Sequence, residues 1–245
     1  MSIDHSHLQL IVLQCFAQMG SDAFAQKMFS KMVELKVKAW QPLYGKKFLP
    51  LYTFDFFSCH LLLCVAEKTD WLPIVGYSPT SLKMCQFYKQ KFPYYSQWEM
   101  YSKAQEHFKA INLCIQESEA LEKDLWWDSE LSIHPNYKND QEFLREAIAA
   151  MNVFYHQSMP ASNRLRIGML KNHMDQFWEK WGYEKLRWEG QLCPALKIAW
   201  MNQEEVFLMC LKNFSDLGIQ ISKNYRELWE KRIEIDSPQK DSKNF

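Results

Sequence analysis

The chain has 245 residues, which is enough for one large domain or two small ones, with a sizeable core in either case. It carries 29 Lys and Arg against 29 Asp and Glu, and this zero net charge argues against a general nucleic-acid binder, which would carry an excess of basic residues. Hydrophobic residues make up 47% of the chain, so the composition is globular and excludes a disordered protein.

The seven cysteines are odd in number and no pair has Cys-x-x-Cys spacing, so neither a zinc ribbon nor a disulfide framework is indicated. We expect seven reduced thiols and a cytoplasmic protein. The apolar stretch 8–16 lacks a basic region before it, and no stretch approaches the roughly 18 apolar residues of a membrane span. His5 and His7 have no companion ligands, so no metal site is predicted.

The first predicted elements are a short helix or strand within 7–19 and an amphipathic helix over 23–40. Ser21 and Asp22 can cap this helix, and Pro42 and Gly45 end it. Its apolar residues recur at helical spacing: Phe24, Met28, Met32, Leu35 and Ala39.

Two apolar runs, 61–66 and 72–76, are separated by four polar residues and predict a β-hairpin. Pro79 and Thr80 are expected to break the chain after it. The elements predicted for the rest of the chain are helices at 80–91 and 97–123, a strand at 125–133, a helix at 141–157, a strand at 164–170, a helix at 172–181 closed by Gly182, strands at 184–189 and 195–201, and a helix at 204–214.

This order predicts one mixed α/β domain over 1–236, in which a twisted mixed sheet is flanked by helices. A helical insertion is expected at about 80–123, and the polar tail 237–245 is expected to be disordered.

Three stretches, in the right order, resemble the GNAT superfamily of acyltransferases. The strand and turn 131–138 (LSIHPNYK) are similar to the segment that binds the acyl thioester in that superfamily. The segment 176–183 (QFWEKWGY) resembles its late helix, and the hairpin 61–76 stands where the superfamily has its central strands.

Within the superfamily, the chain looks most like autoinducer (acyl homoserine lactone) synthases and N-acyl amino acid synthases, over residues 24–200. Phe29–Trp40 looks like their N-terminal helix, and Asp55–His60 (DFFSCH) looks like their acidic segment. After the Val-Gly that ends the hairpin these synthases usually carry an arginine, whereas this chain reads Tyr77-Ser78-Pro79. The usual phosphate loop contains glycines, but the matching residues 138–142 (KNDQE) have none.

The resemblance implies transfer of an acyl group from acyl-CoA or acyl carrier protein to an amine acceptor, which is an amino acid or resembles homoserine lactone. Acyl-CoA or an acyl-phosphopantetheine is then a co-substrate, and no covalently bound cofactor is expected. Neither nucleic acid nor a membrane span is expected among the partners.

Asp128 and Glu130 are the predicted catalytic residues. Amide formation needs a group that takes the proton of the attacking amine, and a carboxylate can do this. The two acids lie two apart on one predicted strand, so they share a face that aromatic and aliphatic residues border, and burial would raise a pKa toward a useful value. The alternative is a solvent-facing pair at a strand edge.

The predicted binding residues depend mainly on the resemblance. Asp55 and His60 are the candidates for acceptor recognition, although they could instead cap a turn and begin a strand. Trp127 and Trp178 could line the acyl chain or belong to the core. Ser132, Ile133, Lys138 and Asn139 are the candidates for the donor site, near the start of the helix at 141.

Two other interpretations stay open. One is an inactive GNAT-like protein that binds a ligand or partner, and the other is an unrelated helical protein that uses 97–123 as an interaction face.

Overall fold

The computed structural model describes most of the chain: residues 8–14, 20–51, 53–67, 70–81, 124–158, 164–171, 174–198, 204–211 and 213–235. The predicted insertion, apart from residues 80 and 81, and the predicted tail lie outside the described residues. The described residues fall into two compact units. The first draws on residues up to 79, 130–148 and those from 225 onward, and the second draws on 80–129 and 149–224.

The first unit is built on strands β1 (Leu8–Leu13), β2 (His60–Glu67), β3 (Asp70–Ser81) and β11 (Ile233–Ile235). β1 pairs antiparallel with β2 and parallel with β11, and β2 and β3 form an antiparallel hairpin with an irregularity between Leu63 and Cys64. The predicted hairpin is therefore confirmed. β3 continues through Pro79 and Thr80, so the break predicted there is wrong.

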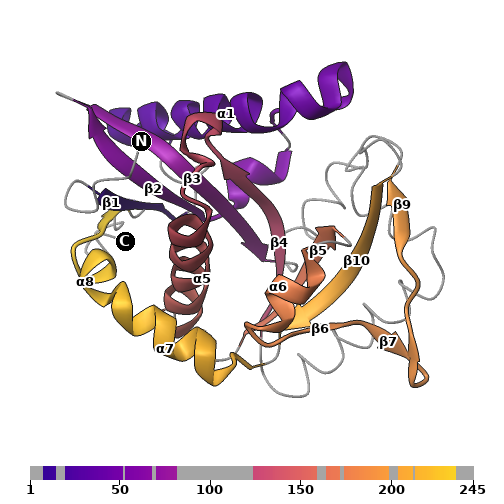
Figure 1. The fold of residues 1–245 in the computed structure, drawn as a ribbon. Coiled ribbons are helices and arrows are strands. Elements are labelled where there is room, and N and C mark those ends of the chain that lie inside the picture. The colour runs from indigo at the N-terminus through magenta and orange to yellow at the C-terminus, as the bar shows by residue number, and fades with distance from the viewer. Residues whose placement is uncertain are drawn as a thin grey trace, which may run out of the picture. The chain divides into compact units, whose positions relative to one another are not determined.

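Helix α1 (Ala23–Tyr44) packs along these strands, as Figure 1 shows. Asp22 caps it, because its side chain accepts a hydrogen bond from the Ala25 N–H at 2.7 Å. The predicted apolar stripe turns inward, and Met28 and Met32 join Ile11 and Leu62 in the core of the unit. The helix extends one turn past the predicted end, includes Pro42, and stops at Gly45, which has a positive φ of 57°.

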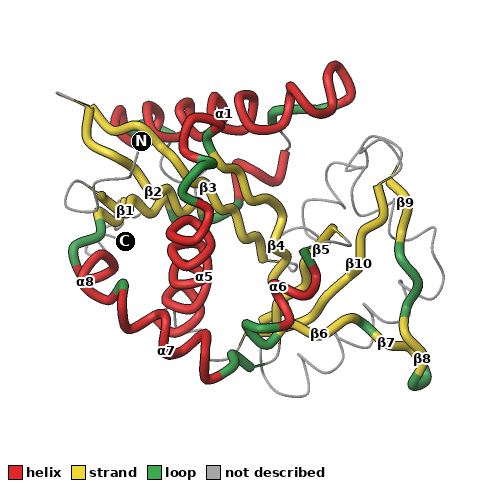
Figure 2. Tube along the Cα trace, in the orientation of Figure 1, coloured by secondary structure: helices red, strands yellow, loops and turns green. Residues whose placement is uncertain are grey.

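Strand β4 (Asp124–Ile133) and helix α5 (Gln141–Ser158) run from one unit into the other. In the second unit, β4 pairs in parallel with β5 (Arg164–Lys171). β10 (Glu204–Leu211) is antiparallel to β5, β6 (Tyr183–Lys185) and β9 (Leu196–Ile198). The strands make a mixed sheet flanked by helices, as predicted (Figure 2).

The helix predicted over 204–214 is wrong, because residues 204–211 form strand β10 (Figure 2). Its residues Val206 and Leu208 to Leu211 are buried, so consecutive side chains on both faces of the strand are covered. A strand buried on both faces has a continuous apolar run without alternation, and such a run does not distinguish a strand from a buried helix.

The remaining elements are short. Helix α6 (Asp175–Glu179) is shorter than predicted, and Gly182 follows it with φ 103°. β7 (Arg187–Trp188) and β8 (Gln191–Leu192) form a separate two-stranded ribbon. Helices α7 (Asp216–Asn224) and α8 (Arg226–Glu230) were not predicted from the sequence. Within the described residues, no helix is both long and apolar enough to cross a membrane.

Candidate functional site

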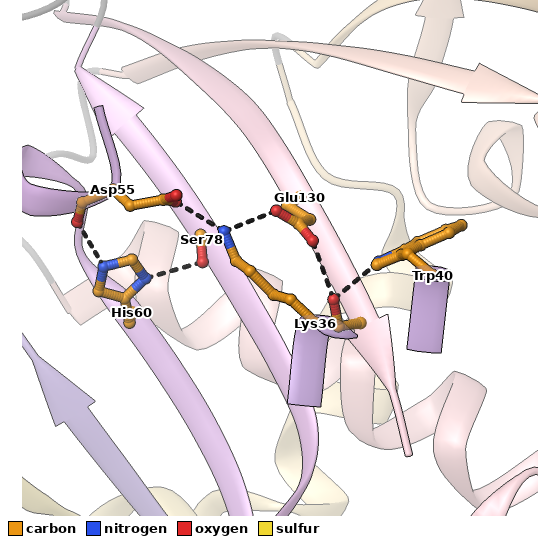
Figure 3. A network of polar contacts seen from close by, with 7 residues as sticks. Lys36, Trp40, Asp55, His60, Ser78 and Glu130 are labelled. Carbon is orange, nitrogen blue, oxygen red and sulfur yellow. Dashed lines mark hydrogen bonds and ion pairs between the residues drawn. The ribbon is translucent and has the colours of Figure 1, made fainter. Parts of the chain in front are cut away.

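A buried polar network in the first unit centres on Lys36, which lies on α1 (Figure 3). Its Nζ lies 2.7 Å from Oδ1 of Asp55, on the short helical turn η4 (Thr53–Phe57), and 2.6 Å from Oε2 of Glu130, on β4. The ammonium group therefore joins two carboxylates that are far apart in the sequence.

The position of Lys36 follows from the helical period. It lies one turn after Met32 and next to Leu35, on the face of α1 that packs against the strands, and only 1% of it is exposed. A charge in such a place is tolerated when it is paired and hydrogen-bonded, and the two carboxylates meet this requirement.

The network continues beyond Glu130 to Trp40. The Ser132 hydroxyl donates to Oε1 of Glu130 at 3.1 Å, and the Trp40 indole N–H donates to the Ser132 oxygen at 2.8 Å. Glu130 is thus held at both carboxylate oxygens, by Lys36 at one and by Ser132 at the other.

His60 closes the network on the other side. Its Nε2 lies 2.7 Å from the backbone carbonyl of Asp55, and its Nδ1 lies 2.8 Å from the Ser78 hydroxyl. A carbonyl can only accept, so Nε2 carries the proton and Nδ1 accepts the hydroxyl proton of Ser78. Burial lowers the pKa of His60 to about 4, even though the Asp55 charge opposes the shift, and the imidazole is neutral at neutral pH.

Burial and pairing act in opposite directions on the other two titrating groups. Burial raises the pKa of Glu130, the ammonium of Lys36 opposes this, and the Asp55 charge adds to it. Burial also disfavours the charged form of Lys36, but the charges of Glu130 and Asp55 outweigh burial and raise the pKa of Lys36. Lys36 is therefore a fixed cation, and Glu130 is an acid whose charge depends on it.

A recess borders the network, lined by Met32, Leu35, Lys36, Gly76, Ser78, Glu130 and Ser132. The space between these side chains is too small for a water molecule. Gly76 permits this close packing of α1 on β3, because a Cβ there would lie 3.1 Å from Cδ2 of Leu35. The carboxylates are thus held in a dry, preorganised arrangement, which strengthens their electrostatic effect.

Asp128 lies in the second unit and has its own partner. The Tyr183 hydroxyl donates to Oδ2 of Asp128 at 2.7 Å. Burial raises the pKa of Asp128 to about 8, and the hydrogen bond from Tyr183 opposes this only in part. Trp178 packs edge-on against the Tyr183 ring, with 5.3 Å between the ring centroids. A carboxyl group that titrates this close to neutrality is suited to proton transfer.

The structure brings four of the predicted residues into one network: Asp55, His60, Glu130 and Ser132. Two others, Asp128 and Trp178, both contact Tyr183. Ile133 is half-buried at the end of β4, and Lys138 and Asn139 are exposed in the turn before α5. The side chain of Trp127 lies outside the described side chains.

Sequence reasoning missed Lys36, Trp40, Ser78 and Tyr183. The signal for Lys36 was a charged residue within the apolar stripe of a predicted helix, where a buried lysine requires acidic partners. No comparable signal marked Ser78 or Tyr183, whose partners depend on tertiary contacts.

The start of α5 already has a carboxylate cap. Oδ1 of Asp140 accepts from the Phe143 N–H at 3.3 Å. The first turn of this helix also contains Glu142. Both acids oppose the attraction that a helix N-terminus has for phosphate.

A solved acyl-homoserine lactone synthase shares the fold of this chain. BjaI, a CoA-dependent acyl-homoserine lactone synthase solved with SAM and isopentyl-CoA, matches with a TM-score of 0.52 and 11% identity, over 96% of both chains. BjaI solved with MTA matches with a TM-score of 0.51. FeeM, an N-acyl amino acid synthase from uncultured soil microbes, matches with a TM-score of 0.48 and 11% identity, over 83% of this chain and 90% of its own.

The likeness to BjaI confirms the predicted fold, a mixed sheet flanked by helices. No protein-family model matches the chain, and no curated protein matches it in sequence. At 11% identity the likeness extends to the fold alone.

Proposed function

We propose that this protein is an N-acyltransferase that moves an acyl group from a thioester, acyl-CoA or acyl carrier protein, to the amine of an amino acid or a compound resembling homoserine lactone. The observation that carries the proposal is the Lys36-bridged pair of Asp55 and Glu130, buried within a fold of this type. Two acids that the sequence singled out independently meet there.

The reaction is a simple exchange. The neutral amine attacks the thioester carbonyl, the new C–N bond forms, and the C–S bond breaks, so that the thiolate leaves. The proton lost by the nitrogen ends on the sulfur, and no covalent enzyme intermediate is required. The protein has to take up that proton and stabilise the oxyanion.

Asp128 is the proposed proton acceptor. A pKa of about 8 makes the Asp128 carboxylate a strong enough base to take the amine proton, and its ionised form is present at neutral pH in a useful fraction. The Tyr183 hydroxyl, which donates to the same carboxylate, orients it. The protonated acid can then return the proton to the leaving thiolate.

Glu130, Asp55 and His60 are proposed to form the acceptor site: Glu130, whose side chain is 11% exposed, is the acid that an amine can reach, and the fully buried Asp55 and His60 hold the network in place. Carboxylates attract an ammonium group, and Glu130 is held by two partners so that its orientation does not change between substrates. In this proposal Glu130 also assists removal of the proton once the amine is bound.

The proposed donor site involves Ser132 and Ile133 on β4 and Lys138 and Asn139 in the turn that follows, while Trp127 and Trp178 contact the acyl chain. Because Asp140 caps α5 and Glu142 follows it, we expect a weak grip on the CoA diphosphate. An acyl carrier protein, which presents only a pantetheine arm, is expected to lose less binding affinity from this weak grip on the diphosphate.

The test is direct assay of amide formation with acyl-CoA or acyl carrier protein and a panel of primary amines. The seven cysteines would react with a thiol reagent, so the amide product should be identified by mass spectrometry. An amide product that forms only when the acyl donor, the amine and the protein are all present supports the proposal. Donor binding without product in any combination would favour the inactive GNAT-like alternative.

The site residues are tested by Asp128→Asn and Glu130→Gln, which keep shape and remove charge. We expect each variant to lower turnover at neutral pH by about a hundredfold or more, the usual scale for loss of a proton-transfer group. Glu34→Gln, at an exposed acid on α1, is the matched control and should retain activity. Unchanged turnover in both site variants would remove the carboxylate mechanism.

A further inference from the structure

Lys36 has a role that neither the sequence nor the fold likeness assigns. We propose that Lys36 is a positioning residue whose ammonium group fixes the Glu130 carboxylate in one orientation and keeps it ionised. This inference builds on the proposed function, because Glu130 is part of the proposed acceptor site.

The first support is geometric. Both oxygens of Glu130 are held by groups that α1 controls: Lys36 contacts Oε2 at 2.6 Å, and Trp40, one turn further along, holds the Ser132 hydroxyl that donates to Oε1. The plane of the carboxylate is therefore set by one helix. Asp55 holds the other side of the ammonium at 2.7 Å and prevents Lys36 from rotating away.

The second support is the charge around Glu130. The titratable groups that face it among the described residues are Lys36 from α1, Asp55 from η4 and, behind Asp55, the neutral His60 from β2. Lys36 is the cation of this network. Without it the charges of Glu130 and the fully buried Asp55 would face each other with no cation between them, and one carboxylate would take up a proton because like charges at close range cannot both ionise there.

The test compares Lys36→Met, which keeps the length of the side chain, with Lys36→Arg, which keeps the charge. Lys27→Met is the matched control, because Lys27 lies on the same helix and pairs with Asp70 at 2.8 Å on the surface. The double variant K36M/D55N leaves Glu130 as the one acid of the pair. It replaces Lys36→Met in the test if Lys36→Met alone does not fold.

The first readout does not depend on turnover. The infrared band of a protonated carboxyl group, assigned to Glu130 by its loss in Glu130→Gln, is followed against pH. In Lys36→Met and in K36M/D55N we expect the midpoint for protonation of Glu130 to rise by about one to three pH units. Lys36→Arg and Lys27→Met should leave it near the wild-type value.

The second readout is the pH dependence of amide formation. The limb of kcat against pH that Glu130 sets, as distinct from the limb that Asp128 sets near pH 8, should move to higher pH in Lys36→Met, while KM for the acyl donor stays within about threefold, since Lys36 is not placed in the donor site. Lys36→Arg should recover most of the activity, and Lys27→Met should match wild type.

A purely structural role would lower the stability of Lys36→Met and leave the Glu130 midpoint in place, and that result would overturn the inference. A raised midpoint without any amide formation by wild type would support the role of Lys36 and reject the proposed function. The two failures are therefore distinguishable.

Discussion

At the scale of single residues, Asp128 connects function to stability. A carboxyl group that folding shifts to a pKa of about 8, from about 4 in an unfolded chain, keeps a proton that the unfolded chain releases. The contribution of Asp128 to stability is therefore fully present below about pH 4 and is lost as the pH rises toward 8. A buried carboxyl group that lowers stability at neutral pH is typical of a functional site.

We predict that Asp128→Asn raises the free energy of unfolding by about 1–3 kcal/mol at neutral pH, because the amide has no charge to bury and still accepts from Tyr183. Urea unfolding at several pH values measures this. The gain over wild type should grow from pH 5 to pH 8, a range set by the two pKa values. A variant that is less stable than wild type across this range would contradict the buried, protonated state of Asp128.

The sequence predicted the acids of the site better than their partners. Asp55 was predicted from the resemblance, and Glu130 from its place two residues from Asp128 on a predicted strand with apolar neighbours. Lys36 was not predicted, because lysine side chains are normally solvated and a single lysine beside an apolar stripe does not by itself mark a site. Which acid meets which cation depends on the docking of α1 and η4 on the strands, and local pattern does not contain that information.

At the scale of elements, the turn after α6 depends on Gly182. Its φ of 103° is rarely adopted by residues with a side chain, and a Cβ would lie 2.9 Å from the backbone nitrogen of Ser215 and also meet the carbonyl oxygen of Asn213. Both neighbours are backbone atoms, so neither can move aside without shifting the chain before α7.

Gly182→Ala should therefore destabilise the protein by about 3 kcal/mol or more, as strain and clash add. Gly190→Ala is the control: its φ is 78°, but no atom lies within 4 Å of the added Cβ, so only the conformational penalty of about 1–2 kcal/mol applies. Denaturant unfolding of both variants measures the difference. Equal losses would mean that the close approach to Asn213 is absent.

The elements that the sequence predicted correctly have a clear hydrophobic period or clear capping and turn residues at their ends. The 23–40 helix has a stripe and a cap, and the hairpin has four polar residues between two apolar runs. Strand β10 has neither, because both of its faces are covered. The pairing of β10 with β5, β6 and β9 overrode the helical interpretation, and such tertiary contacts are not visible in a local window.

At the scale of the whole molecule, burial protects the thiols. Four cysteines among the described residues, Cys59, Cys64, Cys193 and Cys210, are buried. Burial also raises the pKa of Cys64, which removes the reactive thiolate.

We predict that all seven cysteines are alkylated under denaturing, non-reducing conditions and that these four react much more slowly in the native protein. Intact-mass and peptide mass spectrometry measure both. Fewer than seven modified thiols after denaturation would indicate a disulfide, and fast native labelling of Cys59 or Cys64 would contradict the packing of the first unit.

The parallel pairing of β1 with β11 also has a consequence for synthesis. Ile11 is the register partner of Ile233, so β1 is synthesised long before the strand with which it pairs. The unit that holds Lys36, Asp55 and Glu130 draws on three separate segments of the chain, which leave the ribosome at different times. A nascent chain that stops before β11 exposes one edge of β1, and we expect it to depend on chaperones until β11 is released.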